Sequence, residues 1–431
     1  MPKDKHVDII TMGCSKNLVD SEILLHLFKD NNYTIHHDPA QVSGDIAIVN
    51  TCGFIGDAKE ESVNMILQLA DLKLDGKLKK LYVMGCLSQR YHDELLAEIP
   101  EIDGVYGKFD WRKIVKDISS DNHMEEDQRI VTTPKHYAYV KISEGCNRAC
   151  AYCAIPIITG RHISRPIEAI VKEVKNLVQQ GVKEFQIIAQ DLSYYGIDLY
   201  HESRLAALVE ALANIPGVEW LRLHYAYPTK FPYDLLPLMA KHKNVCAYLD
   251  IALQHISSPV LKAMRRGINK EETIALLERI RREVPGIYLR TTMMVGFPNE
   301  SEEDFQELCT FIQEYPFERL GVFPYSEEEG TFAGDHMEDK ISEAVKEERT
   351  AKLMQIQESI GQAAALRLVN STQQVIIDRK ENDYYVGRTQ YDSPEVDPEV
   401  IVYSEKALNV GEFYQVKITD NDGFDLIGHL S

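Results

Sequence analysis

The stretch SEGCNRACAYCAIP (143–156) holds Cys146, Cys150 and Cys153 in a C-x3-C-x2-C spacing. Thiolates are soft ligands that suit iron and zinc. Zinc motifs usually pair two C-x2-C knuckles, and this chain offers no partner knuckle for the one at 150–153. A 4Fe–4S cube needs a ligand on each iron, so three closely spaced cysteines leave one iron open for a cofactor or substrate. The spacing therefore favours an open iron–sulfur cluster over zinc.

Six apolar strand candidates surround this stretch, and the cysteines follow the first of them. The candidates are YAYVKI (137–142), FQIIAQ (185–190), WLRLHY (220–225), YLDIAL (248–253), YLRTTMMV (288–295) and LGVFPY (320–325). Helical patterns such as EAIVKEVKNLVQQG and EETIALLERIRREV separate them. Repeated βα units predict a parallel sheet curved into a partial (β/α)6 barrel, two units short of a complete (β/α)8 barrel.

Three more cysteines upstream share one context, because each stands at the C-terminal end of an apolar strand and beside a glycine. The strands are 7–13, 45–51 and 80–85, and the residue pairs are Gly13–Cys14, Cys52–Gly53 and Gly85–Cys86. Helical patterns between these strands indicate a doubly wound α/β domain, in which the carboxyl ends of parallel strands line one edge. The glycines allow the backbone to lie close to a bulky ligand. We therefore predict a second open cluster; the alternative is three buried cysteines that act as small hydrophobes.

The rest of the chain divides by composition. A polar, acidic run, SSDNHMEEDQ (119–128), is typical of a linker, and the tail has short strand patterns with Gly, Asn and Asp turns, as in a small all-β barrel. The predicted divisions are an N-terminal domain at 1–118, a linker at 119–132, a barrel domain at 133–365 and a β-barrel domain at 366–431.

Composition limits the functional classes. The chain has 431 residues, 44% of them hydrophobic, and a net charge of −20, which argues against a general nucleic-acid binder and is compatible with a basic protein partner or with plain solubility. We find no transmembrane run and no signal peptide, so we expect a cytoplasmic protein. Eight cysteines in a reducing compartment indicate metal binding or catalysis, although Cys246 and Cys309 have the context of core residues.

The cysteine spacing at 146–153 resembles the signature of the radical S-adenosylmethionine (SAM) superfamily, in which the open iron binds SAM, and Tyr152 stands where that superfamily has an aromatic residue. The whole chain is similar to the methylthiotransferases, which have an N-terminal three-cysteine domain, a radical SAM domain and a TRAM domain. One branch (MiaB type) modifies an adenosine in tRNA. The other (RimO type) modifies the β-carbon of an aspartate in small-subunit ribosomal protein twelve.

Three motifs resemble the RimO branch: GCSKNLVDSE (13–22), YLDIALQHISSPVLKAMRRG (248–267) and GRTQYDSPEVD (387–397). The tRNA branch usually has a Gln-x-Asn run after its first cysteine, and a Gln-Ser-Gly sequence where this chain has Gln254, His255 and Ile256. The resemblance thus implies that this chain is an aspartate methylthiotransferase, with tRNA methylthiolation as the alternative. A non-catalytic iron–sulfur electron carrier or RNA-associated scaffold is a remote alternative, because it explains neither the cysteine spacing nor the barrel.

The resemblance also implies cofactors and partners. Two 4Fe–4S clusters and SAM are expected: one SAM methylates a sulfur held at the cluster of Cys14, Cys52 and Cys86, and a second SAM is reductively cleaved at the other cluster to form the radical that activates the aspartate. The expected partners are the ribosomal protein, free or in the assembled subunit, and a reductant such as a flavodoxin or ferredoxin. Any contact with RNA is secondary, and no membrane is expected.

Several polar residues at predicted strand ends are weaker candidates for contact with SAM or substrate. They are Gln190, Asp191, Gln254, His255 and Gly296, together with Tyr152, and the alternative is that the polar ones are ordinary loop-capping groups. Arg265 and Arg266 are interpreted as a solvated helix end rather than as ligands of the SAM carboxylate.

The acidic tail suggests a docking surface. Residues 370–431 contain five Lys and Arg against twelve Asp and Glu, which suits a basic ribosomal protein better than RNA. Glu395, Asp397 and Glu399 alternate along SPEVDPEV, so we predict one exposed acidic row that docks this partner. The alternative is a solvated surface without a partner.

Overall fold

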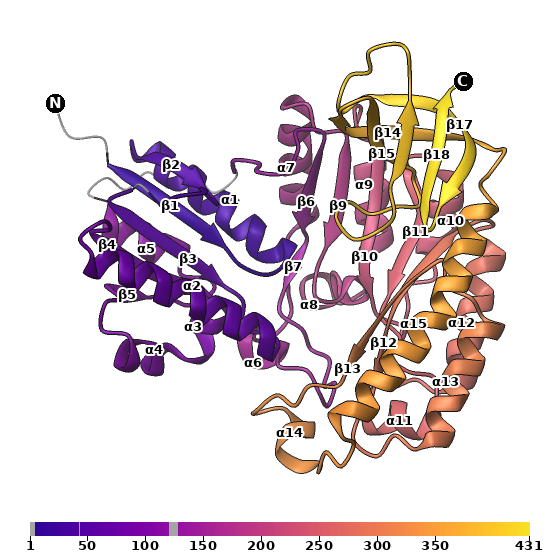
Figure 1. Cartoon of the computed structure of the whole chain (residues 1–431), viewed down its shortest axis with the longest axis horizontal. Helices are drawn as coiled ribbons and strands as arrows, with labels where there is room; N and C mark the ends of the chain where they lie inside the picture. The colour runs from indigo at the N-terminus through magenta and orange to yellow at the C-terminus, as the bar shows by residue number, and fades with distance from the viewer. Residues whose placement is uncertain (1–4, 43, 120–127) are drawn as a thin grey trace.

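The computed structural model describes residues 5–42, 44–119 and 128–431. It contains an N-terminal α/β domain, a central βα domain and a C-terminal β-barrel, which follow one another along the chain (Figure 1). In Figure 1 the central domain lies between the other two, with the C-terminal barrel above it. In the described part of the chain, no helix is long and apolar enough to cross a membrane.

The N-terminal domain is a five-stranded parallel sheet with helices on both faces. Its strands, in sheet order, are β2 (Thr34–His37), β1 (His6–Thr11), β3 (Ile46–Thr51), β4 (Lys80–Gly85) and β5 (Gly104–Val105). Its helices are α1 (Ser15–Asp30), α2 (Gly56–Leu74), α3 (Cys86–Arg90), α4 (His92–Glu98) and α5 (Trp111–Ile118). One core packs α1 and α5 against one face of the sheet, and a second packs α2 and α4 against the other. The predicted doubly wound fold is confirmed; β2 and β5 are edge strands too short or too polar to predict.

The central domain is an open barrel of six parallel strands in chain order, as predicted. Its strands are β6 (Tyr137–Lys141), β9 (Glu184–Ile188), β10 (Trp220–Ala226), β11 (Val245–Ile251), β12 (Tyr288–Val295) and β13 (Arg319–Pro324). The outer helices are α7 (Ile167–Gln179), α9 (Leu205–Ala213), α10 (Leu235–Lys241), α12 (Lys270–Glu283), α13 (Glu302–Glu314) and α15 (Glu343–Leu366). Shorter elements are β7 (Ser143–Glu144), α6 (Ile155–Thr159), β8 (Ile163–Ser164), η1 (Leu192–Tyr194), α8 (Ile197–Tyr200), α11 (Ser258–Ala263) and α14 (Phe332–His336).

The two faces of the barrel sheet differ in chemistry. Leu221 and Leu223 of β10 join the large core between the sheet and its outer helices. Arg222 and His224 alternate with them and are also buried, so they point to the inner side of the curved sheet. The inner side is therefore polar, and its buried charges need partners.

The C-terminal domain is a closed five-stranded barrel in the order β14–β15–β16–β18–β17. Its strands are β14 (Thr372–Glu381), β15 (Tyr384–Arg388), β16 (Val400–Tyr403), β17 (Phe413–Asp422) and β18 (Asp425–Leu430). Val375, Val402 and Val416 belong to its core. The small all-β barrel is thus confirmed, and β18 is the strand that the sequence pattern did not predict.

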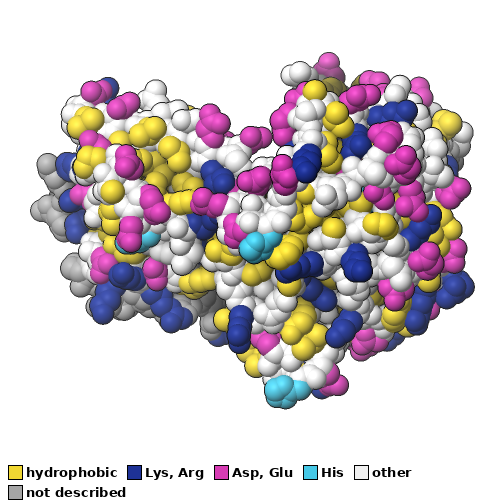
Figure 2. All heavy atoms as spheres, turned by 90° about the horizontal axis from the view of Figure 1, so that it is seen from below, with side chains coloured by type: hydrophobic (Ala, Val, Ile, Leu, Met, Phe, Trp, Pro, Cys, Tyr) yellow, Lys and Arg dark blue, Asp and Glu magenta, His cyan; other side chains and the backbone are white. Residues whose placement is uncertain are grey.

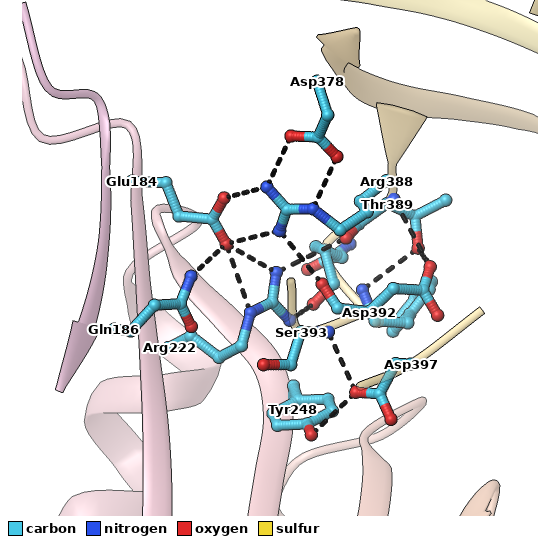
Figure 3. Close-up of polar contacts among 12 residues, drawn as sticks. Glu184, Gln186, Arg222, Tyr248, Asp378, Arg388, Thr389, Asp392, Ser393 and Asp397 are labelled. Atoms are coloured by element: carbon cyan, nitrogen blue, oxygen red, sulfur yellow. Dashed lines mark hydrogen bonds and ion pairs between the residues drawn. The ribbon is translucent and has the colours of Figure 1, made fainter. Parts of the chain in front are cut away.

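This barrel closes the end of the central domain at which the strands begin. Arg388 forms ion pairs with Glu184, the first residue of β9, and with Asp378, both at 2.7 Å (Figure 3). Arg222 contacts the same Glu184 carboxylate at 3.1 Å, and Glu184 and Arg222 are fully buried. The Gln390 carbonyl, in the loop after β15, accepts a further hydrogen bond from Arg222 at 2.5 Å. The end of β15 and the loop that follows it therefore supply partners that the polar inner side of the sheet requires.

The predicted acidic row does not exist as a free surface. Glu395 accepts hydrogen bonds from two tyrosine hydroxyls of β6, at 2.9 and 3.2 Å. Asp397 pairs with Arg290 at 2.7 Å and is almost completely buried. Glu399 is held by both terminal nitrogens of Arg379. The prediction of one exposed row was wrong for Asp397, because its arginine partner comes from a distant strand, which local charge density does not reveal. Glu395 is exposed and Glu399 half-exposed, and both are bonded to other side chains.

The predicted linker lies mostly outside the described residues, at 120–127. Arg129, in its last part, is buried and contacts Glu22 of α1 and Glu173 of α7, the latter at 3.1 Å. The end of this segment therefore joins the N-terminal domain to the barrel.

We expect Arg388→Met to destabilise the protein by about 3–5 kcal/mol, because it removes the cation that the buried carboxylates of Glu184 and Asp378 share. The matched control is Arg379→Met, which removes a half-exposed pair with Glu399 and should cost under about 1 kcal/mol. Urea unfolding of both variants measures the difference. Equal effects would show that the buried network contributes no more than a surface pair.

A second prediction concerns Asp250 on β11, where burial raises the pKa to about 6 against the opposing charge of Arg290. When the pKa of a carboxyl is higher in the folded than in the unfolded protein, the free energy of unfolding falls as the pH rises from about 4 to about 6. Asp250→Asn should therefore raise the free energy of unfolding at pH 7.5 by up to about 3 kcal/mol and have a smaller effect at pH 5. Urea titrations at the two pH values test this; a difference that grows toward low pH would contradict it.

A candidate active site between two sets of cysteines

The three N-terminal cysteines lie together at one edge of their sheet. Cys14 precedes α1, Cys52 follows β3 and Cys86 begins α3. A Cβ on Gly13, which has φ +90°, would lie 2.8 Å from the sulfur of Cys52, and one on Gly53 would lie 2.6 Å from the backbone nitrogen of Leu87. Any side chain at these glycines would force the loops apart, which confirms the close approach expected of the backbone here.

Asn17, in the first turn of α1, connects the loops that carry these cysteines. Its side-chain nitrogen donates to the carbonyls of Met12 and Thr51, both at 3.0 Å, and its oxygen lies 3.6 Å from the sulfur of Cys86. Asn17 is completely buried, so these three contacts of its side chain replace those with water. Asn17 therefore holds together the loops that carry the three cysteines.

The charges around this set differ from thiol to thiol. Burial raises the pKa of Cys86 to about 12, against the opposing charge of Lys108. Around Cys14, desolvation also opposes ionisation, but Lys16 and Lys108 outweigh it and lower the pKa of this thiol. Lys108 itself stays charged, because Glu144 and Asp20 raise its pKa although burial would lower it. Burial also raises the pKa of Cys52, so Cys14 is the one thiol of this set whose surroundings favour the thiolate.

The second set, Cys146, Cys150 and Cys153, lies after β6 at the end of the barrel where active sites are found. The backbone nitrogen of Arg148 donates to the sulfur of Cys146 at 3.4 Å. The sulfur of Cys150 lies 3.3 Å from Arg266 and 3.4 Å from the hydroxyl of Tyr227. Burial raises the pKa of Cys146 to about 11 and that of Cys153 to about 12. These thiols would lose their protons only on binding a cation, as cluster ligands do.

Arg266 differs from its predicted role as part of a solvated helix end. It is 3% exposed, and it donates to Cys150, to the hydroxyl of Tyr152 at 3.2 Å and to the carbonyl of Ala252. Arg265 is exposed, as predicted, and lies over the ring of Phe332. The two neighbours differ because Arg265 has φ +57° and ends the helical segment, after which the chain turns inward.

The weaker candidates lie in the loops that follow the barrel strands. Asp191 forms an ion pair with Arg148 at 2.7 Å and caps η1, and Gln190 donates to Glu144 at 3.3 Å. Gln254 has a left-handed backbone, with φ +75°, and forms an isolated bridge to Met293 of β12. These contacts bring the residues to the same end of the barrel as the cysteines.

Gly296 and His255, two further candidates at this end of the barrel, contact the buried side chain of Glu300. The backbone nitrogen of Gly296 donates to Glu300, whose other oxygen lies 3.5 Å from His255. His255 and Glu300 are both fully buried, and a Cβ on Gly296 would lie 2.3 Å from Lys346. Gly296 therefore follows β12 in a tightly packed turn.

The two sets of cysteines meet across the domain boundary. Cys86 packs in one buried cluster with Ala154 and Ile158, and Ala154 directly follows Cys153. Arg90 of α3 reaches across to Glu328 at 3.0 Å. Lys16, two residues after Cys14, lies 3.7 Å from the ring centre of Tyr225 on β10. The N-terminal set therefore faces the open end of the barrel.

The residues present fit iron–sulfur clusters better than a single ion. Among the described residues, no three His, Cys, Asp or Glu side chains could hold one metal ion. A 4Fe–4S cube instead takes one thiolate per iron, so its ligands do not meet at one atom. The second set has three cysteines with N–H donors to sulfur from Arg148 and Arg266. The N-terminal set has three cysteines, closely packed glycines and the Lys108 ammonium 3.9 Å from the sulfur of Cys86.

Beside the two sets, a cavity of about 470 Å³ lies between the N-terminal domain and the barrel. Its lining includes Asp20, Lys141, Glu144 and Trp111, but none of the six cysteines. Figure 2 shows the molecule from below, with a notch between the N-terminal domain on the left and the barrel domain on the right. Lys and Arg side chains mix with hydrophobic ones in the middle of this face, although the net charge of the chain is −20.

Comparison with known proteins agrees with this architecture. Residues 6–107 match the uncharacterized protein family UPF0004, residues 140–312 the radical SAM superfamily and residues 369–430 the TRAM domain. The chain is 58% identical over 431 residues, the whole of both chains, to a Parabacteroides distasonis protein named ribosomal protein uS12 methylthiotransferase RimO. The chain belongs to the RimO methylthiotransferase family. A family member from Phocaeicola vulgatus is 59% identical and covers 99% of this chain and 100% of its own.

Solved structures share the fold of this family at low identity. The radical SAM methyltransferase TsrM from Kitasatospora setae, with cobalamin and a [4Fe-4S] cluster bound, has a TM-score of 0.55 and 14% identity, and the match covers 77% of each chain. The cobalamin-dependent SAM radical enzyme OxsB has a TM-score of 0.54 and 12% identity, covering 83% of this chain and 56% of its own.

Sequence reasoning missed Asn17, Lys108, Tyr227 and the true position of Arg266. Asn17 had a faint signal, because it lies three residues after Cys14 in GCSKN, where a polar residue follows a strand end. Lys108 had none: it is a lysine after Gly107, far from any cysteine in sequence. Lys108 lies beside Cys86 because β5, which precedes Lys108, pairs with β4, which precedes Cys86.

We expect Asn17→Ala to lower the free energy of unfolding by about 2–3 kcal/mol, since it removes two buried hydrogen bonds and leaves their carbonyls unpaired. It should also lower iron bound at the N-terminal set, because Asn17 holds those loops together. The control is Asn214→Ala, which removes a bond on an exposed helix end and should keep full iron content. Iron assay and urea unfolding measure both effects; wild-type iron and stability in Asn17→Ala would contradict this role.

Proposed function

We propose that this chain is a radical SAM methylthiotransferase that adds a methylthio group to the β-carbon of an aspartate in ribosomal protein uS12. The observation that carries the proposal is the packing of Cys86 against the segment that follows Cys153, which sets two three-cysteine frames face to face. A reaction that joins a sulfur to a carbon needs the sulfur site and the site of carbon activation within reach of one substrate. The close relatives of this chain carry the same activity in their names.

We propose one 4Fe–4S cluster in each frame, with SAM at the cluster of Cys146, Cys150 and Cys153. When bound, this cluster and SAM supply the one-electron chemistry that an unactivated C–H bond requires. Arg266 and Tyr227 would hold Cys150 in position and shield its sulfur from water, since both contact it and both are buried. We also propose that the domains are divided near residues 118, 132 and 365.

The SAM-binding residues that we propose are Tyr152, Gln190, Asp191, Gln254 and Gly296, because the loops that carry them surround the open end of the barrel. In this structure Gln190 and Asp191 contact Glu144 and Arg148, which lie two residues on either side of Cys146. These contacts would orient the cysteine loop toward the cofactor.

The substrate is proposed to approach this open end and not the TRAM domain. The acidic residues of the TRAM loop are engaged at the opposite end of the barrel, where Tyr288 of β12 stacks on Tyr391. We further propose a cytoplasmic protein that uses a flavodoxin or ferredoxin as its reductant, with RNA contact in a secondary role. tRNA methylthiolation stays the alternative that the experiment below addresses.

The decisive experiment compares uS12 from a strain without this gene with uS12 from the same strain carrying the wild-type gene. Mass spectrometry should show the methylthio-aspartate only with the wild-type gene, and the modified adenosine of tRNA should be unchanged. A gene with Cys146, Cys150 and Cys153 replaced by Ala is the matched control and should not restore the modification. Unmodified uS12 in the complemented strain, or loss of the tRNA modification, would contradict the proposal.

Iron content tests the two-cluster assignment separately. The wild-type protein should bind about eight irons per chain, on the basis of two cubes, and each triple Cys→Ala variant about four. The variant of Cys14, Cys52 and Cys86 should still cleave SAM reductively to 5′-deoxyadenosine, but it should form no methylthiolated product. Loss of all iron in either variant, or stoichiometric zinc in the wild type, would show that the two frames are not independent clusters.

A further inference from the structure

Lys108 is a buried cation at the boundary between the two sets of cysteines. Its side chain is 2% exposed, and its ammonium lies 3.9 Å from the sulfur of Cys86. The carboxylates of Asp20 and Glu144 stand at 3.9 and 4.0 Å, beyond hydrogen-bond distance. Asp20 belongs to α1 of the N-terminal domain and Glu144 to β7 of the barrel, so Lys108 lies where the two domains meet.

The hydrogen-bond donors of this ammonium are not satisfied by the protein. Within the described residues, the single hydrogen bond of the Lys108 ammonium is the long one to Cys86. Lys141 contacts both nearby carboxylates, and Gln190 donates to the Glu144 oxygen that faces Lys108. The Asp20 oxygen that faces Lys108 has no hydrogen-bond partner among the described residues, and at 3.9 Å it is too far from the ammonium to accept one. An ammonium has three donors, and burying them without acceptors is costly. The carboxylates of Asp20 and Glu144 balance the charge of Lys108, but they lie too far away to accept its hydrogen bonds. The ammonium therefore keeps free donors, among the described residues, for a ligand with lone pairs beside Cys86.

The backbone holds Lys108 in this place. Its backbone nitrogen donates to the side chain of Gln89 at 3.2 Å, and Gln89 lies on α3, the helix that begins with Cys86. A Cβ on Gly107 would lie 2.4 Å from the same Gln89 oxygen, so the loop and the helix are in close contact. The lysine therefore has a fixed position relative to the cysteine set rather than a flexible surface one.

We infer that Lys108 is a positioning residue that holds an anionic sulfur species, hydrosulfide or methylthiolate, at the open iron of the Cys14–Cys52–Cys86 site. This inference rests on the proposed function, which places a cluster there. The ammonium would donate hydrogen bonds to the sulfur and offset its negative charge in a water-poor boundary. Lys16, the other cation near Cys14, is directed to the ring of Tyr225 instead.

The test uses the full-length chain with Cys146, Cys150 and Cys153 replaced by Ala, so that only the N-terminal cluster remains. Into this parent we would introduce Lys108→Met, and as a control Lys116→Met, which removes an exposed lysine of α5 in the same domain. Sodium hydrosulfide is titrated without oxygen and followed by the electron paramagnetic resonance spectrum of the reduced cluster. The reduction potential of the cluster is measured in the same samples.

Lys108→Met should weaken hydrosulfide binding by about tenfold to a hundredfold, the loss of one charged hydrogen bond. It should also lower the reduction potential, because a positive charge near the cluster favours the reduced form. Lys116→Met should match the parent in both measurements. Parent-like hydrosulfide affinity and potential in Lys108→Met would overturn the inference and leave the proposed function standing.

Two further outcomes are informative. If Lys108→Met loses iron, Lys108→Gln, which keeps a polar side chain without the charge, replaces it; parent-like hydrosulfide affinity in that variant overturns the inference. If the parent itself binds no cluster, both the two-cluster assignment and the inference are wrong. The modification of uS12 measured in cells distinguishes that case from an error about Lys108 alone.

Discussion

The structure depends on a group of buried charges at the boundary between the N-terminal domain and the barrel. Lys141 of β6 contacts Asp20 of α1 and Glu144 of β7, and Lys108 lies beside both carboxylates. Removing one member of such a group leaves an uncompensated charge and costs far more than the net contribution of the group. The group therefore fixes how the two domains meet, and with it the separation of the two sets of cysteines.

Buried charges also join two domains at the opposite end of the barrel. There Glu184, Arg222 and Arg388 form a buried network that joins the barrel to the TRAM domain. The outer face of the sheet is apolar and is covered by the barrel's own helices, whereas the inner face is polar at both ends. One end is closed by the TRAM loop and the other faces the cysteines. The central domain thus holds its two neighbours through charges on the inner face of one sheet.

Much of this architecture can be predicted from local sequence, because a buried parallel strand is a short apolar run and a strand end followed by Gly and Cys is easy to recognise. All nine predicted strands of the first two domains form within a few residues of their expected bounds. The edge strands β2 and β5 were missed because TIHH and GV carry no apolar pattern. The barrel strand β18 was missed because its run DLIGHL is interrupted by Gly. The acidic row of the tail was misread for a related reason, because a carboxylate looks the same in sequence whether water or a buried arginine is its partner.

The sequence by itself determined the two sets of cysteines, the order of the three folds and the family resemblance. These depend on spacing and periodicity, which are properties of neighbours along the chain. Only the tertiary structure decided that Arg266 lies against Cys150, that Lys108 lies against Cys86 and that the carboxylates of the TRAM loop close the barrel. Each of these contacts joins residues more than 20 positions apart, and the partner of a charge at such a separation is chosen by how the domains pack.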